Sequence, residues 1–257
     1  MKASTEDLFC GGRLRVRQPR CGYRFSIDAV VLAAFLRPRP GQRIADLGTG
    51  CGIIALLLAS RCPKTNIVAV ELQEDLVQLA RENVSGNGFS PVIEVVAGDL
   101  RRMSRRELGG GFDWVVSNPP FRAPGKGRVC RDGGRAVARH EITLGLDDLL
   151  QAARRLLDPG GRLALVYDAG RTADLLCGMR GAGLEPKRLR FVHGSERHAA
   201  RMVLAEARRG GRPGLLVEPP LRLFDAQGRY TPEVQACLEI DSAPRPHPPV
   251  DFDPRNR

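Results

Sequence analysis

The chain has 257 residues, 42% of them hydrophobic, which is enough for one α/β domain that needs no stabilising metal or disulfide framework. Its formal net charge of +11 favours a polyanionic partner such as RNA, although most of this charge is arginine, which also fits a compositional bias. The apolar runs are too short to span a membrane, and the first seven residues lack the apolar core of a signal peptide, so the sequence predicts a cytoplasmic protein. The seven cysteines form no C-x-x-C pair, which predicts free thiols and no metal site.

The N-terminal residues 1–40 are predicted to form a hairpin and a buried helix. Arginines alternate with apolar residues over 13–17, a period that suits a strand with one basic face. Ser26 is placed as the N-cap of a helix over residues 29–36, which the prolines of 37–41 bring to an end.

A strand over residues 43–47 leads into a glycine turn, and a helix over 53–60 follows. This order is typical of the nucleotide-binding opening of a doubly wound sheet. A dinucleotide fold needs its third glycine at the position of Ile53, whereas here Gly52 comes one residue early. The turn therefore predicts a nucleotide site without a pyrophosphate cradle.

Acidic side chains stand where successive strands end. Asp46 lies near the end of the first strand, Glu71 ends a strand over 66–70, and Asp99 follows a strand over 92–96. An acid about 20 residues past the glycine turn holds ribose hydroxyls in α/β nucleotide sites. Because the carboxyl ends of parallel strands meet at one edge, the three acids are predicted to line one cleft.

A strand over residues 112–116 ends in Ser-Asn-Pro-Pro-Phe. Asn118 offers a carboxamide oxygen, Pro119 offers a carbonyl with no competing N–H, and Phe121 offers a flat apolar face. This trio suits a planar ring that bears an amino group, since the oxygens would accept the two amino hydrogens while Phe121 stacks on the ring. The alternative is a Pro-Pro loop after a buried strand.

The remaining segments continue an alternating β/α pattern. Residues 101–111 are predicted to be a basic helix and a glycine turn, and 122–139 a loop that clamps a substrate. The later elements are a helix over 146–157 closed by residues 158–161, a strand over 162–167, a helix over 171–181 and two antiparallel strands over 188–193 and 201–207. Segments within 213–241 are expected to pack back on the domain, and 242–257 to form a disordered tail.

The run Asp-Leu-Gly-Thr-Gly-Cys-Gly at 46–52, followed in order by Glu71, Asp99 and residues 118–121, resembles the class I S-adenosylmethionine-dependent methyltransferases that act on amino groups. Motifs at 22–28, 139–141, 219–221 and 228–231 narrow the resemblance to the bacterial tRNA1(Val) adenine-N6-methyltransferase family, up to residue 240.

The resemblance implies a Rossmann-like α/β fold whose seven-stranded, mostly parallel sheet has a reversed last strand and helices on both faces. The catalytic domain would cover residues 41–212. It also implies transfer of a methyl group from S-adenosyl-L-methionine to the adenine just 3′ of the tRNA anticodon. The partner would be tRNA or another structured RNA, and the oligomeric state is left open.

The same resemblance assigns a role to each motif residue. Cofactor binding falls on Asp46, Gly48, Gly50, Glu71, Asp99, Leu100 and Asn118. Within this set, Glu71 would take the ribose hydroxyls, and Asp99 with Leu100 would frame the cofactor's adenine. Catalysis falls on Asn118 and the Pro119 carbonyl, which would hold the target amino group, and on Phe121, which would stack on its base.

Other acceptors share these motifs. Guanine N2 in ribosomal RNA is one, and a protein glutamine amide is another, although Phe121 and the short N-terminus disfavour the latter. A binding module that keeps the scaffold without activity would have a broken cofactor turn, and none is broken here.

Overall fold

Strand-forming and helix-forming runs alternate along the chain, and the structure, a computed structural model that describes residues 4–19, 26–119 and 145–239, follows this alternation. The elements in chain order are β1 (Ser4–Phe9), β2 (Leu14–Pro19), α1 (Ile27–Phe35), β3 (Arg43–Leu47), α2 (Ile53–Arg61), β4 (Asn66–Glu71), α3 (Glu74–Gly86), β5 (Ile93–Ala97), β6 (Phe112–Ser117), α4 (Leu146–Leu156), β7 (Leu157–Asp168), the 3-10 turn η2 (Ala169–Arg171), α5 (Thr172–Gly181), β8 (Leu184–His193), β9 (Ala200–Arg209), β10 (Leu216–Val217), β11 (Leu221–Arg222) and α6 (Pro232–Leu238).

One large sheet forms the centre of the molecule, with the strand order β10-β8-β9-β7-β6-β3-β4-β5 and with β11 also paired to β8. β9 is antiparallel to β7 and to β8, and the other pairs are parallel. The turn between β8 and β9 covers only residues 194–199, whereas a parallel crossover needs about a dozen residues. The predicted sheet with a reversed last strand is therefore confirmed, and the two-residue strands β10 and β11 enlarge it from seven strands to nine.

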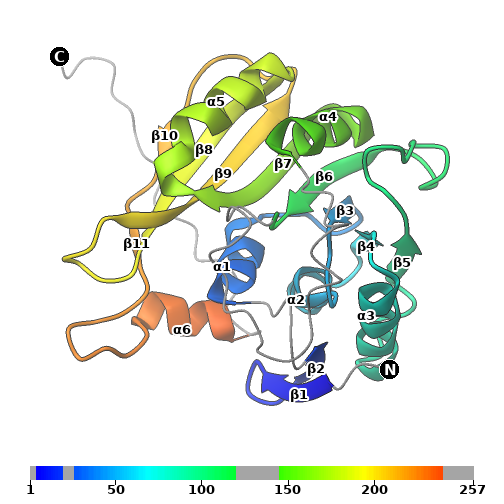
Figure 1. The fold of residues 1–257 in the computed structure, drawn as a ribbon, viewed down its shortest axis with the longest axis horizontal. Coiled ribbons are helices and arrows are strands. Elements are labelled where there is room, and N and C mark those ends of the chain that lie inside the picture. The colour runs from blue at the N-terminus through cyan, green and yellow to red at the C-terminus, as the bar shows by residue number, and fades with distance from the viewer. Residues whose placement is uncertain (1–3, 20–25, 120–144, 240–257) are drawn as a thin grey trace, which may run out of the picture.

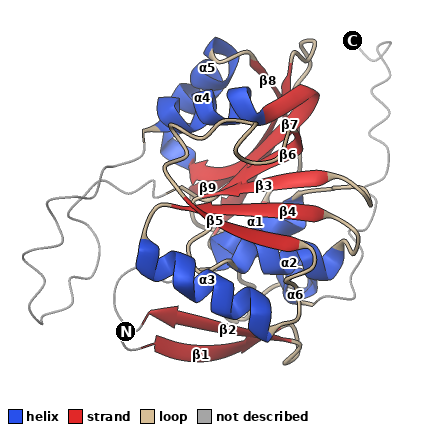
Figure 2. Ribbon diagram, turned by 90° about the vertical axis from the view of Figure 1, so that its right-hand side faces the viewer, coloured by secondary structure: helices blue, strands red, loops and turns tan. Residues whose placement is uncertain are grey.

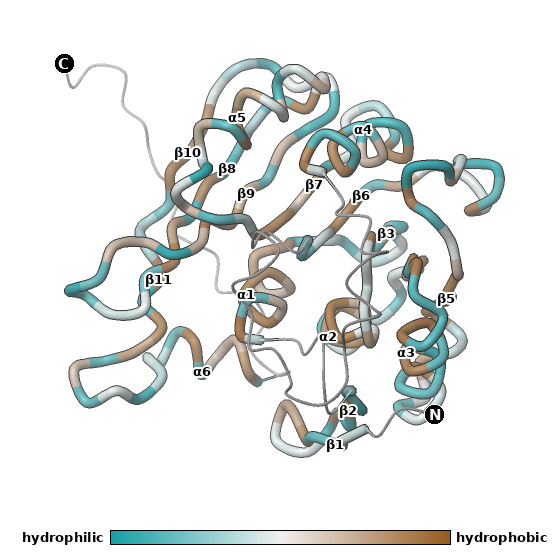
Figure 3. The backbone as a smooth tube through the Cα atoms, viewed as in Figure 1, coloured by the Kyte–Doolittle hydropathy of each residue, from teal (hydrophilic) through white to brown (hydrophobic). Residues whose placement is uncertain are grey.

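Helices cover both faces of this sheet (Figure 1). Successive strand residues point to opposite faces, so Ile44 of β3 joins the apolar core under α1 and α2, whereas Ala45 joins the core under α4 and α5. Figure 2 shows α4 and α5 on one side of the sheet and α1, α2 and α6 on the other. Apolar residues accordingly gather in α1, α2 and the central strands, while the outer loops are hydrophilic (Figure 3).

The hairpin of β1 and β2 packs beside α3 (Figure 2). Leu14 and Val16 of β2 are buried, while Arg15 and Arg17 between and after them are exposed. The predicted hairpin is confirmed, but its exposed face is not uniformly basic, because Glu6 of β1 lies opposite Arg17 and pairs with it at 3.3 Å. At the other end of the described chain, α6 buries Val234 in the same apolar core, and β11 is a parallel partner of β8.

The predicted basic helix over residues 101–111 is wrong, because these residues form a series of turns. The Arg105 guanidinium donates to the carbonyls of Arg155 and Leu157, so it belongs to a tertiary contact and not to a solvated helix face. A helix here would also lack an apolar stripe to bury, and packing of such a stripe supplies most helix stability in proteins.

Two smaller predictions also need correction. Ser26 occupies the N-cap position of α1, but its side chain makes no capping hydrogen bond, and only its carbonyl accepts from the Ala29 N–H at 3.2 Å. Residues 158–161 do not close α4 as a separate turn. The helix ends at Leu156, and these residues already belong to β7, whose pairing with β6 shifts register between Phe112 and Trp114.

Candidate active site

The strand register brings predicted site residues to one edge of the sheet. β3 lies between β4 and β6, and the last residues of those strands that pair with it are Val70 and Val116. Glu71 lies one residue beyond Val70, and Asn118 lies two residues beyond Val116. Because neighbouring strands are about 4.8 Å apart, the two side chains flank the end of β3 at the carboxyl edge.

The turn after β3 needs glycine at three positions. Gly48, Gly50 and Gly52 have φ angles of 73°, 61° and 88°, in the left-handed region that side chains with a Cβ rarely adopt. The N–H groups of Gly48 and Thr49 donate to the Val70 carbonyl at 2.9 and 3.0 Å, which fixes the turn to the end of β4. A Cβ at Gly48 would meet no atom of the other described residues within 4 Å, apart from its chain neighbours, so they leave room for a ligand beside this backbone.

Glu71 holds the turn through its carboxylate. Oε2 accepts from the Gly50 N–H, and Oε1 accepts from the N–H groups of Leu72 and Gln73, all at 2.9 Å. The residue is only 6% exposed. Since a carboxylate has about four acceptor positions, about one is left, on Oε2. Glu71 can therefore stabilise the turn and still accept a hydrogen bond from a ligand hydroxyl.

Asp46 is completely buried below the turn. The Thr49 hydroxyl donates to its Oδ2 at 2.6 Å, whereas Oδ1 has no hydrogen-bond partner among residues 4–19, 26–119 and 145–239. Burial raises the pKa of this carboxyl to about 7, the nearby Glu71 carboxylate adds to the rise, and the Thr49 hydroxyl and the more weakly placed Ala55 N–H, which falls outside hydrogen-bond geometry, oppose it. A buried carboxylate oxygen without a partner suits a ligand that brings positive charge or N–H donors.

Asp99 follows β5, where sequence reasoning placed it, but its carboxylate already has a partner. The Arg101 side chain donates to both oxygens, at 2.9 and 3.1 Å from Nε, and the Arg101 backbone N–H donates to Oδ1 at 3.0 Å. These contacts hold the pKa of Asp99 below its usual value. Leu100, next in the chain, is buried. Part of the acceptor capacity that was expected to face an adenine is thus used by Arg101.

Asn118 and Pro119 follow β6 at the same edge. Asn118 is half-buried and Pro119 is buried. Within the described part of the chain, no hydrogen bond occupies the Asn118 carboxamide, so its oxygen can accept one from a substrate. Phe121, the predicted clamp over 122–139 and the motif at 139–141 lie outside the described residues, as does the tail over 242–257.

Sequence reasoning missed three residues that shape this edge. Thr49 holds Asp46, Arg101 holds Asp99, and Asn83 of α3 donates from Nδ2 to the Cys51 carbonyl inside the turn at 2.8 Å. A signal for the first two was available, since a hydroxyl or cation two or three residues after an acid often bonds to it. Asn83 gave only a weak signal in the sequence, that of a polar residue within a predicted helix.

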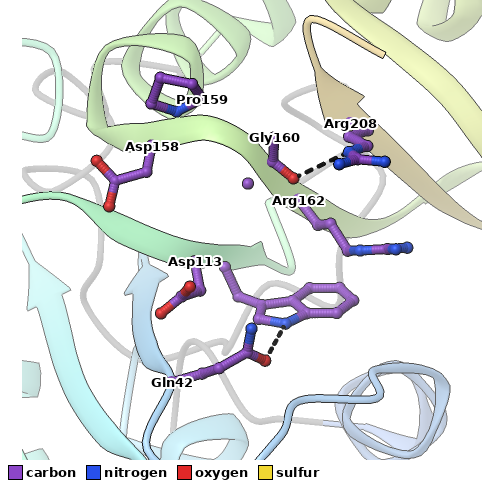
Figure 4. Close-up of a pocket in the computed structure, with 9 residues that line it drawn as sticks. Gln42, Asp113, Asp158, Pro159, Gly160, Arg162 and Arg208 are labelled. Atoms are coloured by element: carbon purple, nitrogen blue, oxygen red, sulfur yellow. Dashed lines mark hydrogen bonds between the residues drawn. The ribbon is translucent and has the colours of Figure 1, made fainter. Parts of the chain in front are cut away.

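A pocket of about 160 Å³ lies at the opposite, amino edge of the sheet (Figure 4). Trp114 Nε1 donates to Gln42 Oε1 at 3.1 Å there, and Arg208 Nε donates to the Gly160 carbonyl at 3.2 Å. Ligand sites of parallel α/β sheets lie at the carboxyl edge, and this pocket is smaller than the several hundred Å³ of a typical cofactor site. We assign it no part in binding.

Comparison with known proteins identifies the family of the chain. The family model for the methyltransferase small domain matches residues 24–179. This chain belongs to the methyltransferase small domain family. The protein is thus a methyltransferase whose cofactor is S-adenosyl-L-methionine.

Several relatives of this methyltransferase carry the name tRNA1(Val) (adenine(37)-N6)-methyltransferase. The protein of that name from Tolumonas auensis is 33% identical over 228 residues, which cover 88% of this chain and 93% of the relative. The one from Porphyromonas gingivalis strain ATCC 33277 is 38% identical over 180 residues, 66% of this chain and 68% of the relative. Among solved structures, a predicted O-methyltransferase from Agrobacterium tumefaciens aligns with a TM-score of 0.68 at 24% identity, over 84% of this chain and 97% of that one, which supports the fold.

The site fits the cofactor. S-adenosyl-L-methionine carries a positive sulfonium, an ammonium group and ribose hydroxyls, and the site offers the partnerless oxygen of Asp46, the open space beside Gly48 and the remaining acceptor of Glu71. No group of His, Cys, Asp and Glu side chains in the described ranges is arranged to hold a metal ion. No helix formed by these residues is both long enough and apolar enough to cross a membrane.

Proposed function

We propose that this methyltransferase acts on N6 of an adenine in tRNA, the adenine 3′ of the anticodon in tRNA1(Val), and that it does so in the cytoplasm. The observation that carries the proposal is the pairing of β6 with β3, which holds Asn118 beside the glycine turn. An adenine in a single-stranded loop can leave its stack at little energetic cost and reach such an edge. The names of the relatives supply the acceptor.

Catalysis would rest on positioning. The bound cofactor supplies an electrophilic methyl group on a positively charged sulfur. The Asn118 carboxamide oxygen and the Pro119 carbonyl would accept the two N6 hydrogens, which turns the nitrogen lone pair away from the ring and toward the methyl carbon. As the new N–C bond forms, the nitrogen becomes positive, and these two hydrogen bonds strengthen before a proton leaves to water. Asp46, Glu71, Asp99 and Leu100 would hold the cofactor.

Among the residues that the structure describes, the cysteine of the glycine turn does not suit covalent catalysis. Methyl transfer to a pyrimidine carbon usually uses a cysteine thiolate as nucleophile. Cys51 lies in the glycine turn, but it is 1% exposed, and burial raises the pKa of its thiol to about 12. The thiol stays protonated and packs in the core, which leaves transfer to nitrogen as the better reading.

The test combines a cellular and an in vitro measurement. Nucleoside mapping of tRNA from cells that lack the protein should show loss of N6-methyladenosine beside the anticodon of tRNA1(Val). In vitro, at saturating cofactor, Asn118→Ala should lose transfer of a labelled methyl group by about a hundredfold or more. Asn66→Ala, at the exposed amino end of β4, is the matched control. Transfer by the wild type to ribosomal RNA or to a glutamine peptide, but not to tRNA, would overturn the proposal.

A further inference from the structure

Two asparagines four residues apart, one on α3 and one at its C-terminal end, contact the backbone of β2. Asn83 Oδ1 accepts from the Arg17 N–H at 2.8 Å, and its Nδ2 donates to the Arg17 carbonyl at 2.9 Å. Asn87, just after α3, does the same with Arg15, at 2.9 and 2.7 Å. Each carboxamide thus exchanges two hydrogen bonds with one residue, as a neighbouring strand would.

The spacing explains why a helix can serve as a strand partner here. Residues four apart on a helix are about 6.0 Å apart along its axis, and residues two apart on a strand are about 6.8 Å apart. Asn83 and Asn87 therefore align with Arg17 and Arg15. This pairing gives hydrogen-bond partners to the backbone N–H and C=O groups of Arg15 and Arg17, on the edge of β2 that faces away from β1. It also fixes the hairpin to α3.

Asn83 makes one contact that Asn87 does not. The second hydrogen on its Nδ2 goes to the Cys51 carbonyl in the glycine turn at 2.8 Å. The corresponding contact of Asn87 Nδ2, at 2.7 Å, is to the Asn83 carbonyl of its own helix. Asn83 is 3% exposed, so this bond is shielded from water. Its carboxamide joins the hairpin, 66 residues away in sequence, to the turn.

The turn is thus held from two sides by one β-α unit. Glu71, at the end of β4, accepts from the Gly50 N–H, and Asn83, on the following helix, donates to the Cys51 carbonyl. Gly50 and Cys51 are adjacent in the chain, and the backbone is left-handed at Gly50 and again at Gly52. Two fixed points on so short a segment restrict how its N–H groups are presented to a ligand.

We propose that Asn83 is a positioning residue for cofactor binding and that it makes the N-terminal hairpin part of the cofactor site. It does not touch the cofactor but sets the geometry of residues 49–52 through the Cys51 carbonyl. The proposal rests on the cofactor site proposed above. Its consequence is that a change at Asn83 alters cofactor affinity beyond any effect on stability, whereas the same change at Asn87 alters stability only.

The matched substitutions are Asn83→Asp and Asn87→Asp. Aspartate keeps the shape of the side chain and the accepting Oδ1, but it replaces the donating Nδ2 group with an oxygen that faces backbone carbonyls. Both variants therefore lose the hydrogen bond from Nδ2 to the carbonyl of β2. Only Asn83→Asp also loses the hydrogen bond to the Cys51 carbonyl. Asn83→Asp should weaken binding of S-adenosylhomocysteine in calorimetry by about tenfold or more, the size expected for a lost buried hydrogen bond. Asn87→Asp should stay within about twofold. Both variants should lower Tm, and Asn83→Asp should lower it more, because its side chain is buried and makes the additional bond to Cys51.

Kinetics give a second readout. KM for S-adenosylmethionine should rise in Asn83→Asp with kcat at saturation kept within about threefold, a split that general destabilisation does not produce. If Asn83→Asp does not fold, Asn83→Ala and Asn87→Ala replace the pair, with hydrogen exchange of residues 48–56 as the measurement. Exchange there should be faster in Asn83→Ala only.

A third variant separates the proposal from its premise. Glu71→Gln places an amide N–H against backbone N–H groups and should weaken cofactor binding if the glycine turn is the cofactor site. Unchanged affinity in Glu71→Gln would overturn that site and the role of Asn83 together. Weaker binding in Glu71→Gln, with equal affinities in Asn83→Asp and Asn87→Asp, would leave the site standing and reduce Asn83 to a clamp for the hairpin.

Discussion

At the scale of single residues, the buried carboxyl of Asp46, which we propose faces the cofactor, makes stability depend on pH. Its carboxyl has a pKa of about 7 in the folded chain against 3.8 without burial. Between these values the folded chain binds a proton that the unfolded chain has lost, so the free energy of unfolding falls as pH rises from about 4 to 7. The full difference is on the order of 4 kcal/mol, which a cationic ligand beside Asp46 would offset.

Asp46→Asn removes this titration. In urea unfolding of the cofactor-free protein, the stability of the variant relative to wild type should therefore increase from pH 5 to pH 8, by about 2–3 kcal/mol. Asp174→Asn, at a side chain that is 63% exposed, is the control and should follow the wild-type pH profile. Parallel profiles for Asp46→Asn and wild type would contradict the raised pKa.

At the scale of elements, an arginine ties β8 to its neighbours. Arg188 lies 2.6 Å from Glu206 of β9 and 2.9 Å from Glu218, just after β10, and its guanidinium stands 4.1 Å from the ring centre of Phe35 on α1. The two glutamates are 1% and 7% exposed. Charges this deep are stable only while they are paired, so Arg188 holds the reversed strand and the C-terminal extension together.

Arg188→Ala should therefore lower the free energy of unfolding by about 3 kcal/mol, because Glu206 then keeps only Arg162 and Glu218 only Arg37, and both of these arginines are more exposed than Arg188. Arg180→Ala is the control. That arginine is 66% exposed and pairs with Glu185 at 3.4 Å, so its loss should cost less than about 1 kcal/mol. Equal losses in the two variants by urea denaturation would show that the Arg188 network contributes little.

The elements also show how far the sequence leads. Strand ends and the glycine turn are local patterns, so the placement of Glu71 and Asn118 at one edge followed from sequence alone. Residues 101–111 were predicted as a helix because the sequence does not show that Arg105 binds carbonyls some 50 residues away. The role of Asn83 is hidden for the same reason, since its partners come from two distant segments.

At the scale of the whole molecule, the net charge of +11 is unevenly available to RNA. Arg105, Arg155 and Arg188 are engaged with protein groups. Arg197 and Arg201 are exposed, in and just after the turn between β8 and β9. This turn lies at the carboxyl edge of the sheet, next to the segment that precedes α6 (Figure 1). In the strand order β8-β9-β7-β6, β8 is three strand spacings, or ~14 Å, from β6, which carries Asn118 beyond its end.

Aromatic rings lie next to these arginines. Phe224 and Tyr230 stack at 5.0 Å, remain 37% and 36% exposed, and the Phe224 N–H donates to the Gly194 carbonyl in the same turn at 3.0 Å. Exposed rings and arginines are the groups on which unpaired bases stack and with which phosphates pair. We therefore expect the RNA to approach the site along this part of the carboxyl edge.

Reversing both charges, Arg197→Glu with Arg201→Glu, should weaken tRNA binding by at least tenfold and reduce the slope of log affinity against log salt by about two, one for each lost phosphate contact. S-adenosylhomocysteine affinity should stay unchanged, since neither residue belongs to the cofactor site. Arg212→Glu, exposed just beyond β9 at the opposite edge of the sheet, changes the net charge without changing this surface. If filter binding shows the same loss per charge in Arg212→Glu, the arginines act through total charge, and the carboxyl edge has no special part in docking the RNA.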